Sequence, residues 1–153
     1  MTLTARIPNP AIHVPGAFQA LQDLSKTAEH PGVPAQTHLL VLLRASQING
    51  CSVCAIQHAR ELKNGGAHED LVFAVAAWHD APYFSEAERA ALALTEAVTR
   101  LSERADPVPD AVWNEAAQHF EEGALGALLI SISAINVWNR LNVSTRQVGG
   151  GSW

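Results

Sequence analysis

Two cysteines and a histidine lie within one short stretch of this chain and could together carry out redox chemistry. Cys51 and Cys54, the only cysteines, are separated by two residues, and His58 follows Cys54 by four. On a helix that begins at or just before Cys51, these side chains share one face, and the imidazole can reach the Cys54 sulfur. A helix N-terminus favours thiolate over thiol through its free N–H groups and partial positive charge. The spacing therefore predicts a dithiol redox site with a histidine base.

Two other interpretations of the cluster remain open at the level of the residues. Free cysteines are commonly buried and inert, so the pair could be structural. Zinc needs four ligands, and the fourth would have to be His38, His79 or His119, none of which lies at a diagnostic spacing. Asn49 and Gly50 form a helix stop just before Cys51. This stop favours the redox interpretation because it places the cysteines at the start of the next helix.

Composition limits the classes of protein that this chain can represent. Its 153 residues, 48% hydrophobic and 16% charged, predict one domain with either an unusually apolar surface or a subunit interface. The net charge of −5 and the lack of a basic cluster argue against nucleic-acid binding. The apolar run at 39–43 is too short to span a membrane, and we recognise no leader, so we expect a cytoplasmic protein. There, a CxxC pair is more often catalytic or metal-binding than a structural disulfide.

The hydrophobic pattern predicts an all-α fold of about six to seven helices and no strands. Residues 1–15 contain several prolines and form an extended N-terminal arm, residues 16–143 form the helical domain, and residues 144–153 form a flexible, glycine-rich tail. We expect the helices at 17–29, 34–48, 51–63, 69–78, 85–103, 111–120 and 123–141. The second of these should be buried on every side, and the last should be central or lie at an interface.

Two details of the long helix at 85–103 can also be predicted. Ser85 followed by Glu88 has the spacing of a capping box, in which each residue satisfies a free N–H group of the other. Glu96 lies on an otherwise apolar face, so its carboxylate needs a partner, for which Arg44 and Arg140 are the candidates. We expect this pairing to be structural.

The segment from Ser46 to His58, SQINGCSVCAIQH, resembles the active-site segment of the carboxymuconolactone decarboxylase / alkylhydroperoxidase AhpD-like superfamily. Segments 77–84, 88–99 and 136–142 also resemble the scaffold of that superfamily, so the resemblance covers nearly the whole chain. It implies an all-helical domain that assembles as a homotrimer or homohexamer. It also implies a peroxidase that uses its cysteine pair on a hydroperoxide, without a cofactor or metal, and is restored by an external dithiol.

Transferred to this sequence, the resemblance gives each member of the cluster a role. Cys54 attacks the peroxide oxygen and becomes a sulfenic acid, Cys51 condenses with it to a disulfide, and His58 helps to deprotonate a thiol. The same superfamily implies an alternative, a lactone decarboxylase-type lyase, which does not need the cysteine pair. A third hypothesis is a non-enzymatic helical oligomer that senses redox state or binds a metal.

The sequence departs from the pattern of the superfamily around this site. Members with peroxidase activity usually place a proton-relay glutamate twelve residues before the first cysteine, where this chain has Leu39, preceded by His38. Val53 stands where the type member has a histidine, and Ile56 and Leu42 stand where polar residues are expected. We therefore predict an apolar pocket without acidic groups, a histidine without a carboxylate partner, and slow turnover.

Overall fold

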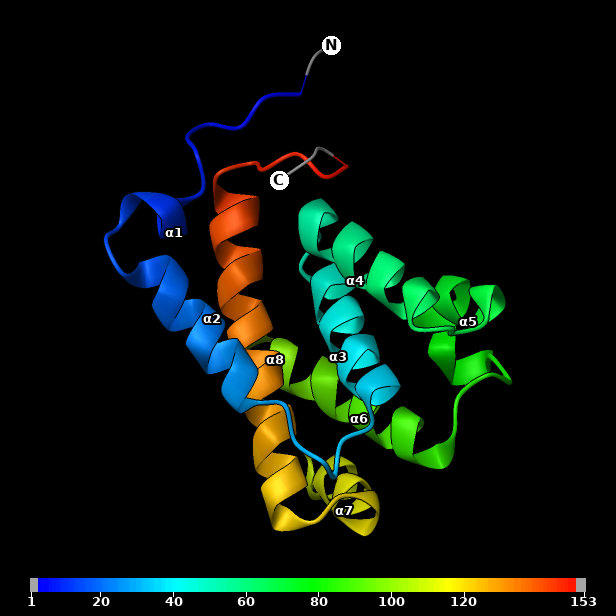
Figure 1. Cartoon of the computed structure of the whole chain (residues 1–153). Coiled ribbons are helices and arrows are strands. Elements are labelled where there is room, and N and C mark those ends of the chain that lie inside the picture. Colours follow the sequence, from blue (N-terminus) through cyan, green and yellow to red (C-terminus); the bar gives the residue numbers. More distant parts are fainter. Residues whose placement is uncertain (1–2, 151–153) are drawn as a thin grey trace.

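The chain folds into a bundle of helices connected by short loops (Figure 1). The structure is a computed structural model that describes residues 3–150, and within that range every regular element is helical, which confirms the all-α prediction. The elements in chain order are α1 (Pro10–His13), α2 (Ala17–Thr27), α3 (Ala35–Ile48), α4 (Ser52–Asn64), α5 (Glu69–Ala74), the 3₁₀ helix η1 (Val75–Asp80), α6 (Glu86–Thr99), the 3₁₀ helix η2 (Leu101–Glu103), α7 (Asp110–His119) and α8 (Glu122–Ser144).

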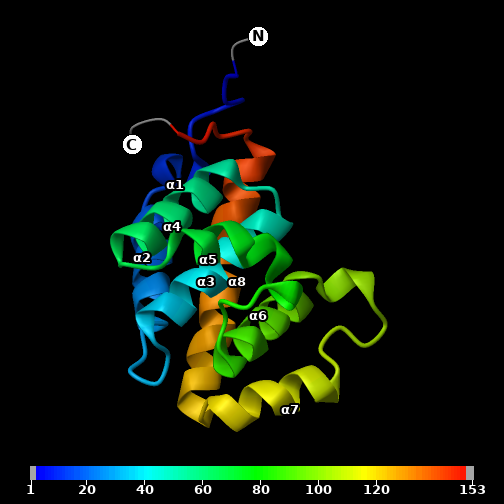
Figure 2. The same ribbon diagram turned by 90° about the vertical axis from the view of Figure 1, so that its right-hand side faces the viewer.

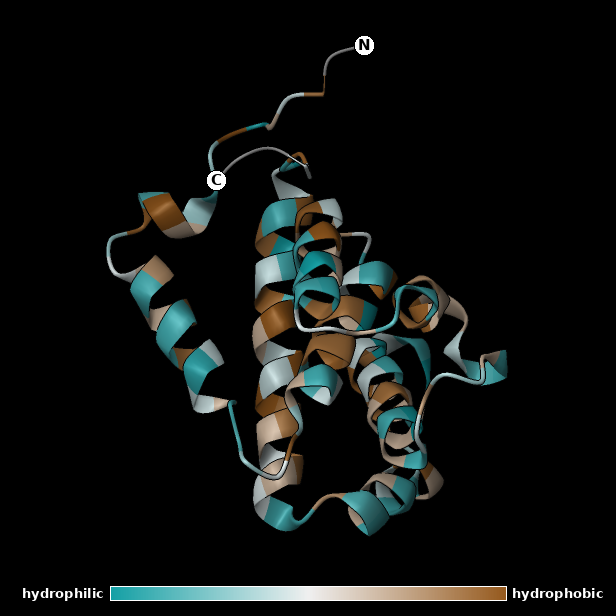
Figure 3. Cartoon of the chain, turned by 45° about the vertical axis from the view of Figure 1, so that its right-hand side comes forward, coloured by the Kyte–Doolittle hydropathy of each residue, from teal (hydrophilic) through white to brown (hydrophobic). Residues whose placement is uncertain are grey.

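The longest helix, α8, runs through the centre of the bundle, as the sequence predicted. Helices α2, α3 and α6 pack along its sides, and α7 lies across one end (Figure 2). Hydrophobic residues follow α8 over most of its length (Figure 3). By length and composition alone, α8 could cross a membrane, but 56% of its most apolar stretch is buried inside the protein. Its apolar character is therefore explained by its place in the core.

Helix α3 lies between α4, α6 and α8, and it is less completely enclosed than predicted. Leu40, Val41 and Leu43 are buried, whereas Leu39 and Leu42 are only partly buried. The prediction of burial on every side was therefore wrong for these two leucines. Both stand beside hollows that the neighbouring helices leave open.

Two boundaries differ from the predicted ones, one because of contacts from a later helix and the other because of a local cap. The helix expected at 69–78 ends as an α-helix at Ala74 and continues as η1, with a non-helical residue at Ala77. The Arg89 guanidinium of α6 donates to the carbonyl oxygens of Trp78 and His79 in η1 and of Ala81 just after it, and so holds this segment in shape. The arm expected to be extended contains the short helix α1, which begins where the Asn9 side chain accepts a hydrogen bond from the backbone of Ala11.

Both predicted details of α6 are confirmed. Ser85 and Glu88 form the capping box at its start. Glu96 pairs with Arg44 of α3 at 2.7 Å and also accepts a hydrogen bond from Trp78 Nε1 at 2.9 Å. Arg140, the other candidate, binds Asn136 instead.

The two ends of the described chain meet at the C-terminal end of α8 (Figure 1). The Arg6 N–H donates to the Thr145 carbonyl at 2.8 Å, and Gln147 Nε2 donates to the Ile7 carbonyl at 2.8 Å. The segment predicted as a flexible tail lies against the start of α4 as far as residue 150, where the Gly149 N–H donates to Ser52 Oγ at 3.2 Å. Residues 151–153 of that predicted tail lie outside the described residues.

Candidate active site

The cysteine pair lies at the N-terminus of α4, where the sequence placed it. Helix α3 ends at Asn49, Gly50 takes a positive φ of 68°, and the chain turns into α4 with Cys51 as its N-cap. A positive φ is readily adopted by glycine, which explains the residue at this turn. The Cys51 Sγ then accepts a hydrogen bond from the Cys54 N–H at 3.3 Å. The first sulfur thus occupies the place where a serine or aspartate oxygen usually caps a helix.

A side-chain amide from α8 joins the two sulfurs. Asn142 Nδ2 lies 3.2 Å from Cys54 Sγ and 3.7 Å from Cys51 Sγ, and it is the donor to both. The Asn142 Oδ1 accepts a hydrogen bond of 2.7 Å from Asn9 Nδ2, so the N-terminal arm orients the amide. Neither asparagine was predicted, because Asn142 lies about ninety residues and Asn9 about forty residues from the cysteines, and no local pattern links them to the pair.

The two cysteines have pKa values shifted in opposite directions. The hydrogen bond from the Cys54 side chain, supported by the Cys54 N–H and by the amides of Asn142 and Asn139, lowers the pKa of Cys51 to about 6 despite its burial. The same hydrogen bond, together with burial and the nearby Cys51 charge, raises the pKa of Cys54. The resting dithiol is therefore a monoanion near neutral pH, with the negative charge on Cys51 and the proton on Cys54.

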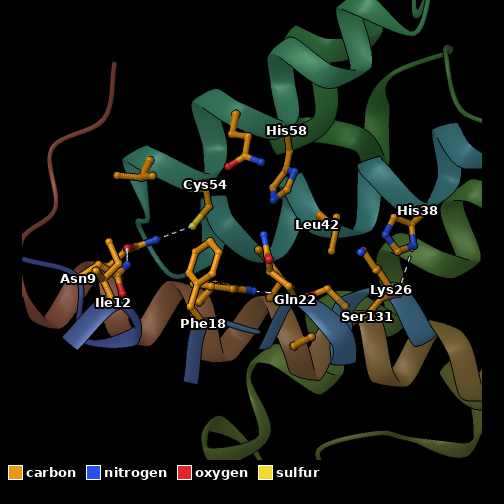
Figure 4. A pocket seen from close by; sticks show the side chains of 17 residues that line it. Asn9, Ile12, Phe18, Gln22, Lys26, His38, Leu42, Cys54, His58 and Ser131 are labelled. Carbon is orange, nitrogen blue, oxygen red and sulfur yellow. Dashed lines mark hydrogen bonds between the residues drawn. The ribbon is translucent and has the colours of Figure 1, made fainter. Parts of the chain in front are cut away.

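A pocket of about 450 Å³ opens beside this pair between α2, α3, α4 and α8 (Figure 4). Cys54 and His58 of α4 line it, together with Asn142. Cys51 does not line it, although both cysteines belong to one small buried cluster with Ala45 and Ile135. Of the two sulfurs, only that of Cys54 can therefore meet a ligand in the pocket.

His58 has a carboxylate partner, contrary to the sequence prediction. The Glu61 Oε2 lies 2.7 Å from His58 Nδ1, and this hydrogen bond lowers the pKa of the Glu61 carboxyl. A carboxylate on Nδ1 fixes the neutral imidazole with its proton there, which leaves Nε2 available to exchange a proton. The prediction failed because we looked for the relay carboxylate on the preceding helix, whereas Glu61 lies one turn further along α4 itself. Its spacing of three residues from His58 is a signal that the sequence contains.

A comparison of the chain with protein-family models identifies its family. The model described as "Carboxymuconolactone decarboxylase family" matches residues 15–97, which is more than half of the chain and includes the cysteine pair. The chain belongs to the carboxymuconolactone decarboxylase family. This confirms the resemblance seen in the sequence.

Relatives of this family member cover most of its length. The uncharacterized protein YdfG of Bacillus subtilis (strain 168) is 28% identical over 130 residues, which span 85% of this chain and 87% of YdfG. The uncharacterized protein YnjA of Escherichia coli (strain K12) is 33% identical over 103 residues, 67% of this chain and 55% of YnjA.

Among solved structures, that of Agrobacterium tumefaciens ATU0492 is similar to this chain. It superposes with a TM-score of 0.89 at 32% identity, covering 97% of this chain and 100% of the other, and it is described as a protein of unknown function connected with the antioxidant defence protein AhpD. The apo debrominase Bmp8 superposes with a TM-score of 0.76 at 22% identity, covering 94% of this chain and 73% of Bmp8. At that identity the likeness concerns the fold alone.

The remaining candidate residues of this carboxymuconolactone decarboxylase family member divide into two groups. His38, Leu42 and Val53 line the pocket. Leu39 and Ile56 do not, so the structure does not bring them into the site. Leu39 packs beside the core cluster of α3 and α4 and borders a separate hollow, and Ile56 approaches the C-terminal segment near Gly149.

Of the three histidines considered as zinc ligands, His38 lines the same pocket as Cys54, whereas the other two lie elsewhere. His79 stacks on Trp78 at a ring distance of 3.7 Å, and His119 lies beside Glu115 on α7. Within residues 3–150, no three histidine, cysteine or acidic side chains are grouped so that they could hold a metal ion. The zinc interpretation therefore has no geometric support in the described part of the chain.

Proposed function

We propose that this protein is a thiol-dependent hydroperoxide reductase in which Cys54 is the peroxidatic cysteine and Cys51 the resolving cysteine. One observation carries the proposal: of two sulfurs joined by a single amide, only Cys54 opens into the pocket, and His58 lines that pocket beside it. Membership of the carboxymuconolactone decarboxylase family supports it, as does the likeness to a protein described in connection with AhpD.

In the first step, the Cys54 sulfur attacks the terminal oxygen of the hydroperoxide. The Cys54 proton passes to the Cys51 thiolate to which it is already hydrogen-bonded, a new S–O bond forms, and the O–O bond breaks. The leaving alkoxide takes a proton that solvent delivers through His58, whose imidazole Glu61 orients, and becomes the alcohol. Cys54 is then a sulfenic acid and Cys51 a thiol.

In the second step, the Cys51 sulfur attacks the sulfenic sulfur of Cys54. The S–S bond forms, the S–O bond breaks, and hydroxide leaves as water with the Cys51 proton. The two thiols have then supplied two electrons, and solvent has supplied one proton through His58. A dithiol reductant, either a small thiol or a protein, returns the disulfide to the dithiol by exchange.

We also propose that the protein works as a homotrimer or homohexamer. Its 48% hydrophobic composition favours an interface, and α8 leaves Ile130, Val137 and Val143 at least 38% exposed. Sedimentation that finds only a species with the mass of one chain would contradict this assembly.

The decisive experiment follows peroxide consumption in the presence of excess dithiol. Cys54→Ser should lower the rate by about a hundredfold or more, because it removes the nucleophile. Without added dithiol, Cys51→Ser should consume one equivalent of peroxide, more slowly because the neighbouring thiolate base is gone, and leave a sulfenic acid that dimedone traps at Cys54. The matched control is Ser52→Ala, an exposed position between the cysteines, which should retain its activity.

The same samples separate the other hypotheses. Loss of both thiols on adding peroxide, without turnover in the presence of dithiol, would indicate a redox sensor and contradict the enzymatic proposal. Lactone decarboxylation that survives Cys54→Ser would indicate the lyase. Stoichiometric zinc in protein purified without chelator would indicate a metal site.

A further inference from the structure

The walls of the pocket are mostly apolar, in contrast to its reacting end, which carries the Cys54 thiol and the His58 imidazole. Apolar side chains from α1, α2, α3, α4 and α8 form most of the lining, namely Ile12, Phe18, Leu42, Val53, Ile135 and Trp138. In the part of the chain that the structure describes, no aspartate or glutamate lines the pocket. Its volume of about 450 Å³ is in the range of pockets for drug-sized molecules. Hydrogen peroxide would contact few of these walls, so the cavity is built for a larger, apolar molecule.

Among residues 3–150, Lys26 is the only lysine or arginine that lines the pocket. Phe18, Gln22 and Lys26 recur at every fourth residue of α2 and so share the face that borders the cavity. Lys26 stands two turns, roughly 12 Å, along the helix from Phe18. Within residues 3–150, its ammonium forms no salt bridge with a carboxylate of the chain.

Phe18 marks the end of the pocket near the sulfur. Its ring packs on Trp138 with centroids 5.8 Å apart, and Trp138 lies one turn of α8 before Asn142, the residue bonded to Cys54. The other end is marked by His38 and Ser131, which are 3.2 Å apart. Ser131 precedes Asn142 by eleven residues, roughly 16 Å along α8. Figure 4 accordingly displays Lys26 beside His38 and Ser131, on the far side of Leu42 from Cys54.

The groups around Lys26 leave its ammonium as the dominant charge at the His38 end of the pocket. Burial lowers the pKa of His38, so its imidazole is neutral near pH 7. Two acidic side chains act on His38, namely Glu29 and Glu61. Glu29 borders the separate hollow on the other side of this histidine, and neither of the two lines the pocket. One end of the apolar pocket therefore carries a thiol and the other an unpaired positive charge.

We infer that the substrate is an amphipathic organic hydroperoxide, with an apolar body and a carboxylate or similar anionic group that Lys26 binds while the peroxide reaches Cys54. The inference rests on the proposed function for the reacting end. It assigns Lys26 as a specificity residue: the ammonium selects the anion, the walls accommodate the apolar body, and a neutral ester loses only the ionic contact.

The test compares a long-chain hydroperoxy acid with its methyl ester as substrates. The native protein should show a kcat/KM about fivefold higher for the acid, the ratio expected from a partly exposed ion pair of about 1 kcal/mol. Lys26→Met should abolish the preference by lowering the kcat/KM for the acid to that for the ester, and Lys26→Arg should retain the preference. Lys63→Met removes an exposed lysine that pairs with Glu69 away from the pocket, and it should behave as the native protein.

A binding measurement separates this inference from the proposed function. Equilibrium dialysis of the corresponding hydroxy acid and its methyl ester, which cannot oxidise the thiols, reports on the pocket alone. Preferential binding of the acid that Lys26→Met removes supports the site even if no hydroperoxide turns over, in which case only the proposed function fails. Turnover of acid and ester at equal rates, or an unchanged preference in Lys26→Met, overturns the inference.

Discussion

At the scale of single residues, the position of the proton within the cysteine pair sets the chemistry. Cys51 receives two backbone or amide N–H donors and carries the charge, while Cys54 holds the proton and faces the pocket. The sulfur that must attack is thus protonated at rest, and its base is the neighbouring sulfur. Asn142 contacts both sulfurs, so its amide stabilises the negative charge before and after the proton moves.

Replacing Asn142 tests this shared donor. Asn142→Leu should raise the first pKa of the dithiol from about 6 toward the ordinary cysteine value of about 8.5, because the charged form loses its amide donor. The thiolate forms as pH rises, so the pH–rate profile should climb through about 6 in the native protein and at a higher pH in the variant. Ultraviolet absorbance of the thiolate measures the same shift without activity.

Asn114→Leu, an identical change at an exposed position of α7, is the matched control and should leave the titration unchanged. A native profile in Asn142→Leu would show that Cys54 and the helix N-terminus stabilise the thiolate without the amide.

The sequence predicted the three site residues on α4 but not their partners Glu61 and Asn142. Cys51, Cys54 and His58 lie on one helix, so their spacing fixes their shared face. Glu61 could have been identified by the same periodicity. Asn142 could not, because its contact with the sulfurs depends on how α8 packs on α4, which the spacing along one helix does not encode.

At the scale of elements, an ion pair ties α6 to α3, the helix that leads into the cysteines. Burial raises the pKa of Glu96, but hydrogen bonds from Trp78 and Arg44 and the charges of Arg44 and Arg100 outweigh it, so the net pKa is lowered. A carboxyl with a lowered folded pKa contributes stability above its unfolded pKa, and this contribution is lost as pH falls through the folded value. The contribution should therefore be complete near pH 7 and vanish in acid.

Glu96→Gln should accordingly lower the free energy of unfolding by about 1 to 2 kcal/mol at neutral pH, since Arg44 loses its charged partner. The difference from the native protein should narrow as pH falls below about 4, where the unfolded-state carboxyl also becomes protonated. Urea unfolding at several pH values measures this. Glu69→Gln, which breaks an exposed pair with Lys63, should change stability by less than about 0.5 kcal/mol; an equal loss in both variants would contradict the argument.

Helix boundaries were predictable where local signals decide them. Asn49 and Gly50 end α3, and Ser85 and Glu88 begin α6, and both were identified from the sequence. The change from α5 to η1 was not, because the turn that follows is held by Arg89 from a later helix. The hollow beside Leu42 likewise depends on the angle at which α2 approaches α8, and the sequence contains no local signal for that angle.

At the scale of the whole molecule, the two chain ends close one side of the dithiol site. The N-terminal arm and the segment after α8 are joined by backbone and side-chain hydrogen bonds, and Asn9 extends from the arm to hold Asn142. The sequence predicted an extended arm and a flexible tail for these segments, since neither has the periodicity of a long helix. Through Asn9 and Asn142, these contacts instead link the position of the two segments to the ionisation of the cysteine pair.

Asn9 provides the test of that connection because its side chain makes two separable hydrogen bonds. Its Oδ1 accepts from the Ala11 N–H at the start of α1, and its Nδ2 donates to Asn142 Oδ1. Asn9→Asp keeps the acceptor that caps α1 but cannot donate to Asn142, whereas Asn9→Ala loses both. If the arm acts on the cysteines through Asn142, both variants should raise the pKa of the dithiol, and Asn9→Asp should raise it further, because its added negative charge opposes the thiolate.

Thiolate absorbance against pH measures the shift, and circular dichroism reports whether the helices remain. A shift in Asn9→Ala that is absent in Asn9→Asp would instead assign the effect to the cap of α1, and the arm would then be a structural element without influence on the sulfur chemistry.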